Sequence, residues 1–293
     1  MQQQEQLSPV LPPIKIKTAF EELCNKHEVL TSGIEKIDSI LKLTRGDRLV
    51  VRGNKKYSQM FVTRLCVNAL LSSSFLPSLS KKKNNSKLVD SRFRTSNVIL
   101  IASGNCCDFY QHVNFARQYY SRDVISRVLS NIIVTRPFTV YQLADIVINQ
   151  LPKVIQQYDA KMIVVSDLLD MFVRDPQIKA NEATYLINEI INSIAKSIAL
   201  EDVLVIVSFS YAHDLFCHNN KPYTSYRRMI LQRFNNCIEI TDSKDKKNGA
   251  IDVKISGTNN SSKRIKNTID DFHNGKSLSI NEKDLLTVSV PTK

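Results

Sequence analysis

Hydrophobic positions along this chain follow two alternating patterns. Short runs that are apolar throughout are typical of strands buried on both faces of a sheet. Segments with apolar residues three or four positions apart are typical of helices that pack one face on a core. The alternation predicts an α/β fold in which helices flank a mostly parallel central sheet. The apolar runs predicted as strands are 48–52, 98–102, 131–134, 162–165 and 203–209.

The helical spacing is strongest in residues 183–200. Pro152 falls inside a second helical segment, residues 140–158, and is expected to kink or restart that helix because it lacks a backbone N–H. Residues 30–41 are predicted as a turn that leads into a helix. Further helices are predicted at 18–27, 60–71, 109–120 and 123–130.

The pattern changes from Cys237 onward, where short apolar stretches are separated by polar turns. Strands predicted at 237–240, 251–255 and 285–290 indicate an antiparallel extension of the sheet. The chain is therefore expected to comprise a flexible N-terminal arm, a core and a polar C-terminal extension with short strands. These divisions are residues 1–17, 18–258 and 259–293, and the core carries a basic insertion at 72–97.

Composition limits the classes of protein to consider. With 293 residues, 43% of them hydrophobic, the chain can bury a large core. It shows neither a signal peptide nor the ~18 consecutive apolar residues needed to cross a bilayer. Six cysteines without a secretion signal indicate a reducing compartment, so we expect a cytoplasmic protein with no membrane partner. The net charge of +12 suits a polyanion such as nucleic acid, and hence a nucleoid-associated protein, although an ordinary basic surface is the alternative.

One segment has the position and length of a phosphate-binding loop. Residues 53–60 follow the first predicted strand, where ligands bind in α/β sheets, and match the length of the motif G-x-x-x-x-G-K-[ST]. However, Ser58 replaces the second Gly, Gln59 replaces the Lys and Met60 replaces the Ser/Thr. Neutral Gln59 cannot neutralise phosphates, and the thioether of Met60 is a poor ligand for Mg²⁺.

Five segments occur in the order and at the spacing of a known family. They are residues 30–38, 45–47, 115–119, 131–138 and 157–165. Together they resemble the RecA/RadA recombinase family, and most closely an archaeal RadA-like paralogue. The resemblance runs from about residue 18 to residue 255 and covers the core ATPase domain only. It implies a RecA-like phosphate-loop NTPase core with degenerate Walker motifs.

Two acidic positions depart from the pattern of the family. The family's catalytic carboxylate follows the strand matching 98–101, but here no acid occurs until Asp108. The family's second acidic motif ends in Asp followed by Ser, whereas here Ser166 precedes Asp167. A shift of one residue along a strand turns a side chain to the other face, so Asp167 is expected to miss a metal unless the strand has ended before it. Asp170 is expected on a helix surface.

These departures remove the lysine, the hydroxyl and the carboxylate from one site. We therefore expect no catalytic residues and no ATP hydrolysis, while ATP binding without hydrolysis stays open. Lys55 and Lys56 either supply charge to a phosphate or are solvated. The degenerate nucleotide site consists of Gly53, Lys55, Lys56, Tyr57, Ser58, Gln59, Met60 and Asp167.

The resemblance implies two loops that contact single-stranded DNA, at 172–179 and 213–228. Cations interleaved with aromatic residues suit phosphate neutralisation and base stacking, and the alternative is an ordinary polar loop. The basic insertion is a third candidate, with a solvated loop as the alternative. The residues expected to contact DNA are Arg174, Lys179, Lys221, Tyr223, Tyr226, Arg227 and Arg228 in the two loops, and Lys81, Lys82 and Lys83 in the insertion.

The resemblance also implies how the chain would assemble. Family members associate through an aromatic-x-x-Ala segment, which corresponds here to Ile16 and Ala19. Ile is a weaker anchor than an aromatic residue, so pairing with a RadA-type recombinase is considered beside self-assembly. His213, Cys217 and His218 lack a fourth zinc ligand nearby, so no metal site is expected.

The leading hypothesis is a catalytically inactive recombinase paralogue. It would bind single-stranded DNA or a RadA-type recombinase and assist homologous recombination and DNA repair. Two alternatives stand beside it because a fold alone does not decide function. One is a weak ATP-binding or ATPase RecA-like protein, and the other is a RecA-fold regulatory scaffold without DNA binding.

Overall fold

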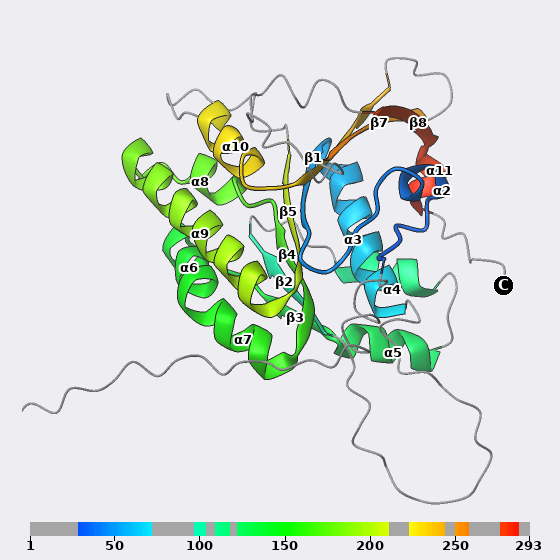
Figure 1. Ribbon diagram of the computed structural model, residues 1–293, viewed down its shortest axis with the longest axis horizontal. Coiled ribbons are helices and arrows are strands. Elements are labelled where there is room, and N and C mark those ends of the chain that lie inside the picture. The colour runs from blue at the N-terminus through cyan, green and yellow to red at the C-terminus, as the bar shows by residue number, and fades with distance from the viewer. Residues whose placement is uncertain are drawn as a thin grey trace, which may run out of the picture.

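The strands form one sheet. The computed structural model describes residues 29–71, 97–103, 109–117, 122–210, 223–243, 250–257 and 276–286. The strands in these ranges are β1 (Arg48–Gly53), β2 (Asn97–Ala102), β3 (Ile132–Thr135), β4 (Ala160–Ser166), β5 (Leu204–Ser210), β6 (Asn236–Asp242), β7 (Ala250–Gly257) and β8 (Lys276–Asn281). They pair in the order β3-β2-β4-β5-β1-β6-β7-β8 (Figure 1). The pairs from β3 to β6 are parallel, and β7 and β8 add in antiparallel fashion.

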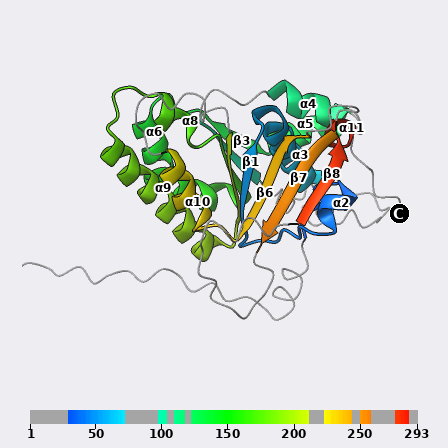
Figure 2. The same ribbon diagram turned by 90° about the horizontal axis from the view of Figure 1, so that it is seen from above.

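Helices cover both faces of the sheet. One face carries α2 (Glu35–Asp38), α3 (Lys55–Leu71), α4 (Phe109–Arg117), α5 (Arg122–Ser130) and α11 (Glu282–Leu286). The other carries α6 (Val140–Asp145), the π-helix η1 (Ile146–Gln150), α7 (Leu151–Tyr158), α8 (Asp170–Arg174), α9 (Ala180–Glu201) and α10 (Tyr223–Leu231). Figure 2 shows the sheet between these two layers. Among the described helices, none combines the length and the apolar character needed to cross a membrane.

The central strands are buried on both faces, which explains their continuous apolar sequence. In β2, Ile99 and Ile101 pack beneath the α6–α10 layer, whereas Val98 and Leu100 pack beneath α3 and α4. The predicted α/β class, with a mostly parallel sheet and antiparallel C-terminal strands, is confirmed.

Several predicted boundaries were wrong. Helix α3 begins at Lys55, five residues before the predicted start of that helix, and the helix expected within 30–41 is the single turn α2. The strand predicted at 285–290 is wrong at its start, because Leu285 lies in α11, and β8 was missed. The interruption expected at Pro152 is a change of helix type, because this residue lies in the first turn of α7 directly after the π-helix η1. The chain stays helical across the junction, since Gln150 and Leu151 keep right-handed helical dihedrals.

A buried arginine joins the two ends of the described core. Arg64 of α3 donates hydrogen bonds through Nε to the carbonyl of Ser32, through Nη2 to that of Gly33 and through Nη1 to that of Asp284. The carboxylate of Asp38 accepts from the backbone N–H groups of Ser32, at 2.7 Å, and of Gly33, at 2.9 Å. The segment before α2, the helix α3 and the C-terminal α11 are therefore held by one guanidinium and one carboxylate.

Replacing Arg64 with Met should destabilise the fold strongly. The substitution keeps much of the apolar stem but leaves the carbonyls of Ser32, Gly33 and Asp284 without this donor, so we expect the free energy of unfolding to fall by about 3–5 kcal/mol. Asn68→Ala is the matched control, because Asn68 Nδ2 also donates to the Ser32 carbonyl, at 2.8 Å, but is half-buried and neutral. It should cost about 1 kcal/mol. Equal losses in urea unfolding would contradict the role assigned to Arg64.

Cys237 of β6 should give the fold an alkaline pH dependence. Burial raises the pKa of Cys237 from 9.0 to about 11. Because the folded-state pKa lies above the unfolded-state value, the stabilisation is complete below about pH 9 and is lost as the pH rises towards 11. We expect Cys237→Ala to flatten the fall in unfolding free energy across this range, measured by urea unfolding at a series of pH values. A constant difference between variant and wild type would contradict this assignment.

Candidate functional site

The site predicted for a nucleotide lies at a crevice of the sheet. The chain leaves β1 for α3 on one face, but leaves the neighbouring β5 for α10 on the other. Adjacent parallel strands whose connections diverge in this way leave a crevice outside their carboxyl ends, and ligands of open α/β sheets bind there. The residues at this crevice are Gly53 at the end of β1, Asn54 and Lys55 directly after it, Asp167 after β4 and Ser210 at the end of β5.

The turn from β1 into α3 is too tight for an open phosphate loop. Gly53 has φ +126°, and a Cβ on this residue would lie 2.0 Å from the carbonyl oxygen of Ile240 on β6. Asn54 then donates its N–H to that carbonyl at 2.7 Å and accepts from the N–H of Lys56 at 2.9 Å through Oδ1. Asn54 therefore caps a helix that begins at once. The loop expected over residues 53–60 is instead the first turns of α3.

The residues that replace the motif are part of this helix. Ser58 and Met60 are buried, and the N–H of Ser58 donates to the carbonyl of Asn54 at 2.9 Å. Tyr57 is half-buried, and burial raises its pKa. A phosphate loop binds its ligand through backbone N–H groups that point outward. In this segment the helix itself engages the N–H of Ser58, and Asn54 engages that of Lys56.

Asp167 faces the crevice although it stands one residue later than the family pattern. Strand β4 ends at Ser166, and Asp167 adopts the left-handed conformation, with φ 51°. Its N–H donates to Ser208 Oγ at 2.9 Å, and its Oδ1 accepts from the N–H of Ser210 at 3.3 Å. The strand has therefore ended before Asp167. This is the condition under which the one-residue shift does not turn the side chain of Asp167 away from the crevice.

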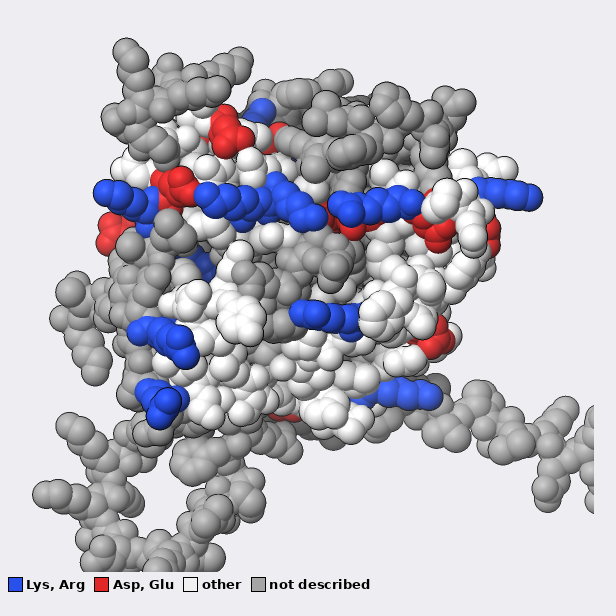
Figure 3. Space-filling model, turned by 180° about the vertical axis from the view of Figure 1, so that it is seen from behind, with Lys and Arg blue, Asp and Glu red and all other residues white. Residues whose placement is uncertain are grey.

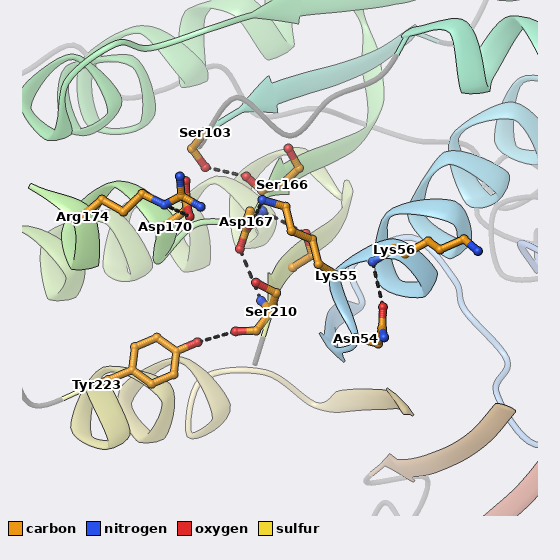
Figure 4. Close-up of polar contacts among 11 residues, drawn as sticks. Asn54, Lys55, Lys56, Ser103, Ser166, Asp167, Asp170, Arg174, Ser210 and Tyr223 are labelled. Atoms are coloured by element: carbon orange, nitrogen blue, oxygen red, sulfur yellow. Dashed lines mark hydrogen bonds and ion pairs between the residues drawn. The ribbon is translucent and has the colours of Figure 1, made fainter. Parts of the chain in front are cut away.

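The two lysines of the segment form different ion pairs. Lys55 Nζ lies 3.7 Å from Asp167 Oδ2, and Figure 4 shows its side chain reaching across the crevice. Lys56 points away from it and pairs with Glu282 of α11 at 2.6 Å. The hydrogen bond to Glu282 raises the pKa of Lys56. The side chain of Lys55 is 36% exposed and that of Lys56 is 63% exposed, so both lysines also remain in contact with solvent.

Hydroxyl groups form hydrogen bonds with backbone carbonyls at the carboxyl ends of the strands. Ser103, directly after β2, donates its Oγ–H to the carbonyl of Ser166 at 2.6 Å. Tyr223 donates its hydroxyl to the carbonyl of Ser210 at 2.7 Å. The family's carboxylate would follow β2, and the segment 104–108 there, including Asp108, lies outside the described residues.

The base-stacking role expected for Tyr223 and Tyr226 is wrong. Both side chains are buried in the first turns of α10, and the hydroxyl of Tyr226 donates to the carbonyl of Ala180 at 3.2 Å. The spacing of Tyr223, Tyr226 and Ile230 is that of the buried face of a helix. The cations next to the two tyrosines favoured a DNA-binding loop instead. Arg227 packs over the ring of Tyr223 at 5.8 Å, while Arg228 is exposed.

The first predicted DNA loop contains an ion pair. Arg174 of α8 is exposed, and its Nε lies 2.7 Å from Asp170 Oδ1. Asp170 is buried, so its expected place on a helix surface was wrong. Lys179 is exposed at the start of α9. The other residues predicted for DNA binding or assembly, Ile16, Ala19, Lys81, Lys82, Lys83 and Lys221, lie outside the described residues.

A second feature is a cleft of about 640 Å³ lined on one side by Arg174, Asp175, Pro176 and Gln177 of the first predicted DNA loop, whereas the sequence indicated no site in the rest of its lining. Arg136 and Phe138, just after β3, form its opposite wall. These two residues lie in a segment that carried the family resemblance but no expected function. The lining consists of Ala102, residues 136–140, Asp170, Met171 and residues 174–177.

Metal ligands do not gather at either place. Across the described ranges, no group of three or more His, Cys, Asp or Glu residues is placed to hold a metal ion. His213, Cys217 and His218 lie outside those ranges.

Comparison with known proteins does not assign the site. A scan against protein-family models matched none of them, and a search of curated proteins found no match.

The pair of Lys55 and Asp167 should contribute measurable but modest stability. The Lys55 side chain is 36% exposed, so Lys55→Met should cost only about 1 kcal/mol of unfolding free energy. Asp167→Ala should cost about 2–3 kcal/mol, because the buried N–H of Ser210 loses its acceptor. Asp167→Asn keeps an acceptor and separates the two effects. In a double-mutant cycle of Lys55→Met with Asp167→Asn, we expect coupling of about 0.5–1 kcal/mol; zero coupling would show that the pair does not stabilise the fold.

Proposed function

We propose that this chain is a non-hydrolysing RecA-like protein that binds single-stranded DNA. In this proposal it acts on chromosomal DNA beside a RadA-type recombinase and assists homologous recombination and repair. One observation supports the absence of ATP hydrolysis in this proposal. The crevice that would hold a nucleotide is occupied by the chain's own groups, with Asn54 on the helix start and Lys55 paired to Asp167 at 3.7 Å.

The internal ion pair argues against hydrolysis on physical grounds. Phosphoryl transfer depends on positioned positive charge and metal at the phosphates. The ammonium group of Lys55 is paired with the carboxylate of Asp167, which also accepts a hydrogen bond from the N–H of Ser210. A nucleotide would have to displace Asn54 from the start of α3 and separate an ion pair whose carboxylate is buried. Both steps oppose binding.

The proposal of a nucleic-acid partner rests on charge and on fold. The net charge of the chain is +12, and Figure 3 shows Lys and Arg side chains in a row across one face, with Asp and Glu beside them. A row of cations suits an extended polyanion better than a compact one. The strand order is consistent with the RecA-like core that the sequence resembles, and that family acts on single-stranded DNA.

Each of two alternative functions is favoured by one structural observation. A weak ATP-binding protein is favoured by the position of Lys55, whose Nζ lies in the crevice itself. A scaffold without DNA binding is favoured by the burial of Tyr223 and Tyr226, because it removes two stacking residues from the DNA surface expected from the family. Each makes a distinct prediction in the same experiment.

Binding of a labelled single strand should be strong at low salt and independent of nucleotide. We expect fluorescence anisotropy to show an affinity that falls steeply with salt, because each neutralised phosphate contributes a slope of about −0.7 in log K against log salt. ATP with Mg²⁺ should change neither this affinity nor the melting temperature. A rise in melting temperature with ATP would favour the ATP-binding alternative. No strand binding at low salt would refute the proposal, and capture of a purified RadA-type recombinase in that case would favour the scaffold.

A further inference from the structure

The cleft beside Arg174 occupies a second point where the connections of the sheet diverge. β2 leads to α4 on one face, whereas its neighbours β3 and β4 lead to α6 and α8 on the other. Ala102, the last residue of β2, lies in the cleft, and the segments that follow β3 and β4 form its walls. The physical rule that places ligands outside the carboxyl ends of such strands therefore applies twice in this sheet. The first crevice is filled by Lys55 and Asp167, and the second is an open cavity of about 640 Å³.

One wall of this cleft presents a cation and an aromatic ring together. Arg136 is exposed, and Phe138 is 85% exposed. The N–H of Phe138 donates to Gln142 Oε1 at 2.8 Å, and Thr139 caps α6 by accepting from the N–H of Gln142 at 3.1 Å. The start of α6 thus fixes the backbone that carries the ring. A large apolar ring held in water loses the free energy that burial would give, about 2–3 kcal/mol for Phe, so a partner that covers it gains that amount.

The opposite wall supplies a second guanidinium. Arg174 uses Nε on Asp170, and a guanidinium carries four further N–H groups in a planar fork suited to phosphate. Asp175 also lines the cleft, and its Oδ1 accepts from the N–H of Gln177 at 2.9 Å. This carboxylate opposes an anion, so it limits the affinity rather than adding to it.

We infer that this cleft holds a segment of single-stranded nucleic acid, with Arg136 and Arg174 at its phosphates and Phe138 stacked on a base. The inference rests on the proposed function and locates it. An inorganic anion would use the cations but leave the ring in water. A duplex keeps the faces of its bases inside the stack, so among nucleic acids it is an unpaired base that can cover Phe138.

The contribution of stacking is tested with Phe138→Ala. Because the ring is exposed, its removal leaves the core intact. We expect affinity for labelled oligo(dT) to fall about five- to tenfold, as for loss of one stacked base. Tyr110→Ala is the control, since Tyr110 is 79% exposed on α4, which packs on the opposite face of the sheet. It should leave the affinity unchanged.

The contribution of charge is tested separately. Arg136→Gln should reduce the slope of log K against log salt by about 0.7, the value for one phosphate of a single strand. Lys153→Gln removes the same charge from α7, which precedes β4 and so lies at the amino end of the strands, and should leave the slope unchanged. Asp175→Asn keeps an acceptor for Gln177 and should strengthen binding about two- to fivefold at low salt.

The outcomes separate this inference from the function on which it rests. If wild type binds oligo(dT) but Phe138→Ala and Arg136→Gln match their controls, the cleft is not the site and the proposed function survives. If wild type does not bind at low salt, both are overturned. Competition by dTMP as effective, per nucleotide, as competition by unlabelled oligo(dT) would overturn a strand in favour of a free nucleotide, and much weaker competition supports the strand.

Discussion

The close approach of Gly53 to the carbonyl of Ile240 determines the form of the carboxyl end of this sheet. Any side chain at Gly53 would collide with β6, and its positive φ suits glycine alone. The chain therefore turns directly into α3, with Asn54 bonded both to β6 and to the N–H of Lys56. A wide loop has no room to form, and the start of the helix is satisfied from within the protein. The lysines that follow then meet carboxylates of the same chain.

The C-terminal strand and helix belong to this arrangement. β8 completes the sheet beside β7, and α11 packs on α3, where Arg64 binds the carbonyl of Asp284. The same helix brings Glu282 to Lys56. The segment formed by β8 and α11 thus covers apolar residues on the α3 face of the sheet, and its Glu282 pairs with the cation of Lys56 at the start of α3. The buried guanidinium of Arg64 also holds the segment before α2, so the two ends of the described core depend on a single side chain.

The two crevices of the sheet differ in what fills them. At the first, Lys55, Asp167 and the N–H of Ser210 satisfy one another, which leaves little for a nucleotide to gain. At the second, Arg136 and Phe138 face an open cleft. A protein that has lost phosphoryl chemistry at one crevice can still bind at the other, because the topology that creates both is unchanged. We therefore propose recognition, rather than catalysis, at this end of the sheet.

The sequence by itself determined the α/β class, the buried central strands and the departures from the phosphate-loop motif at Ser58, Gln59 and Met60, because these depend on local composition and spacing. Only the tertiary structure decided three other features. Asp167 turns into the crevice because Ser208 and Ser210 of a neighbouring strand hold its left-handed backbone. The tyrosines of α10 are buried because α9 packs on them, although cations beside aromatics also fit a DNA-binding loop. The cleft joins three segments far apart along the chain, so no local pattern could reveal it.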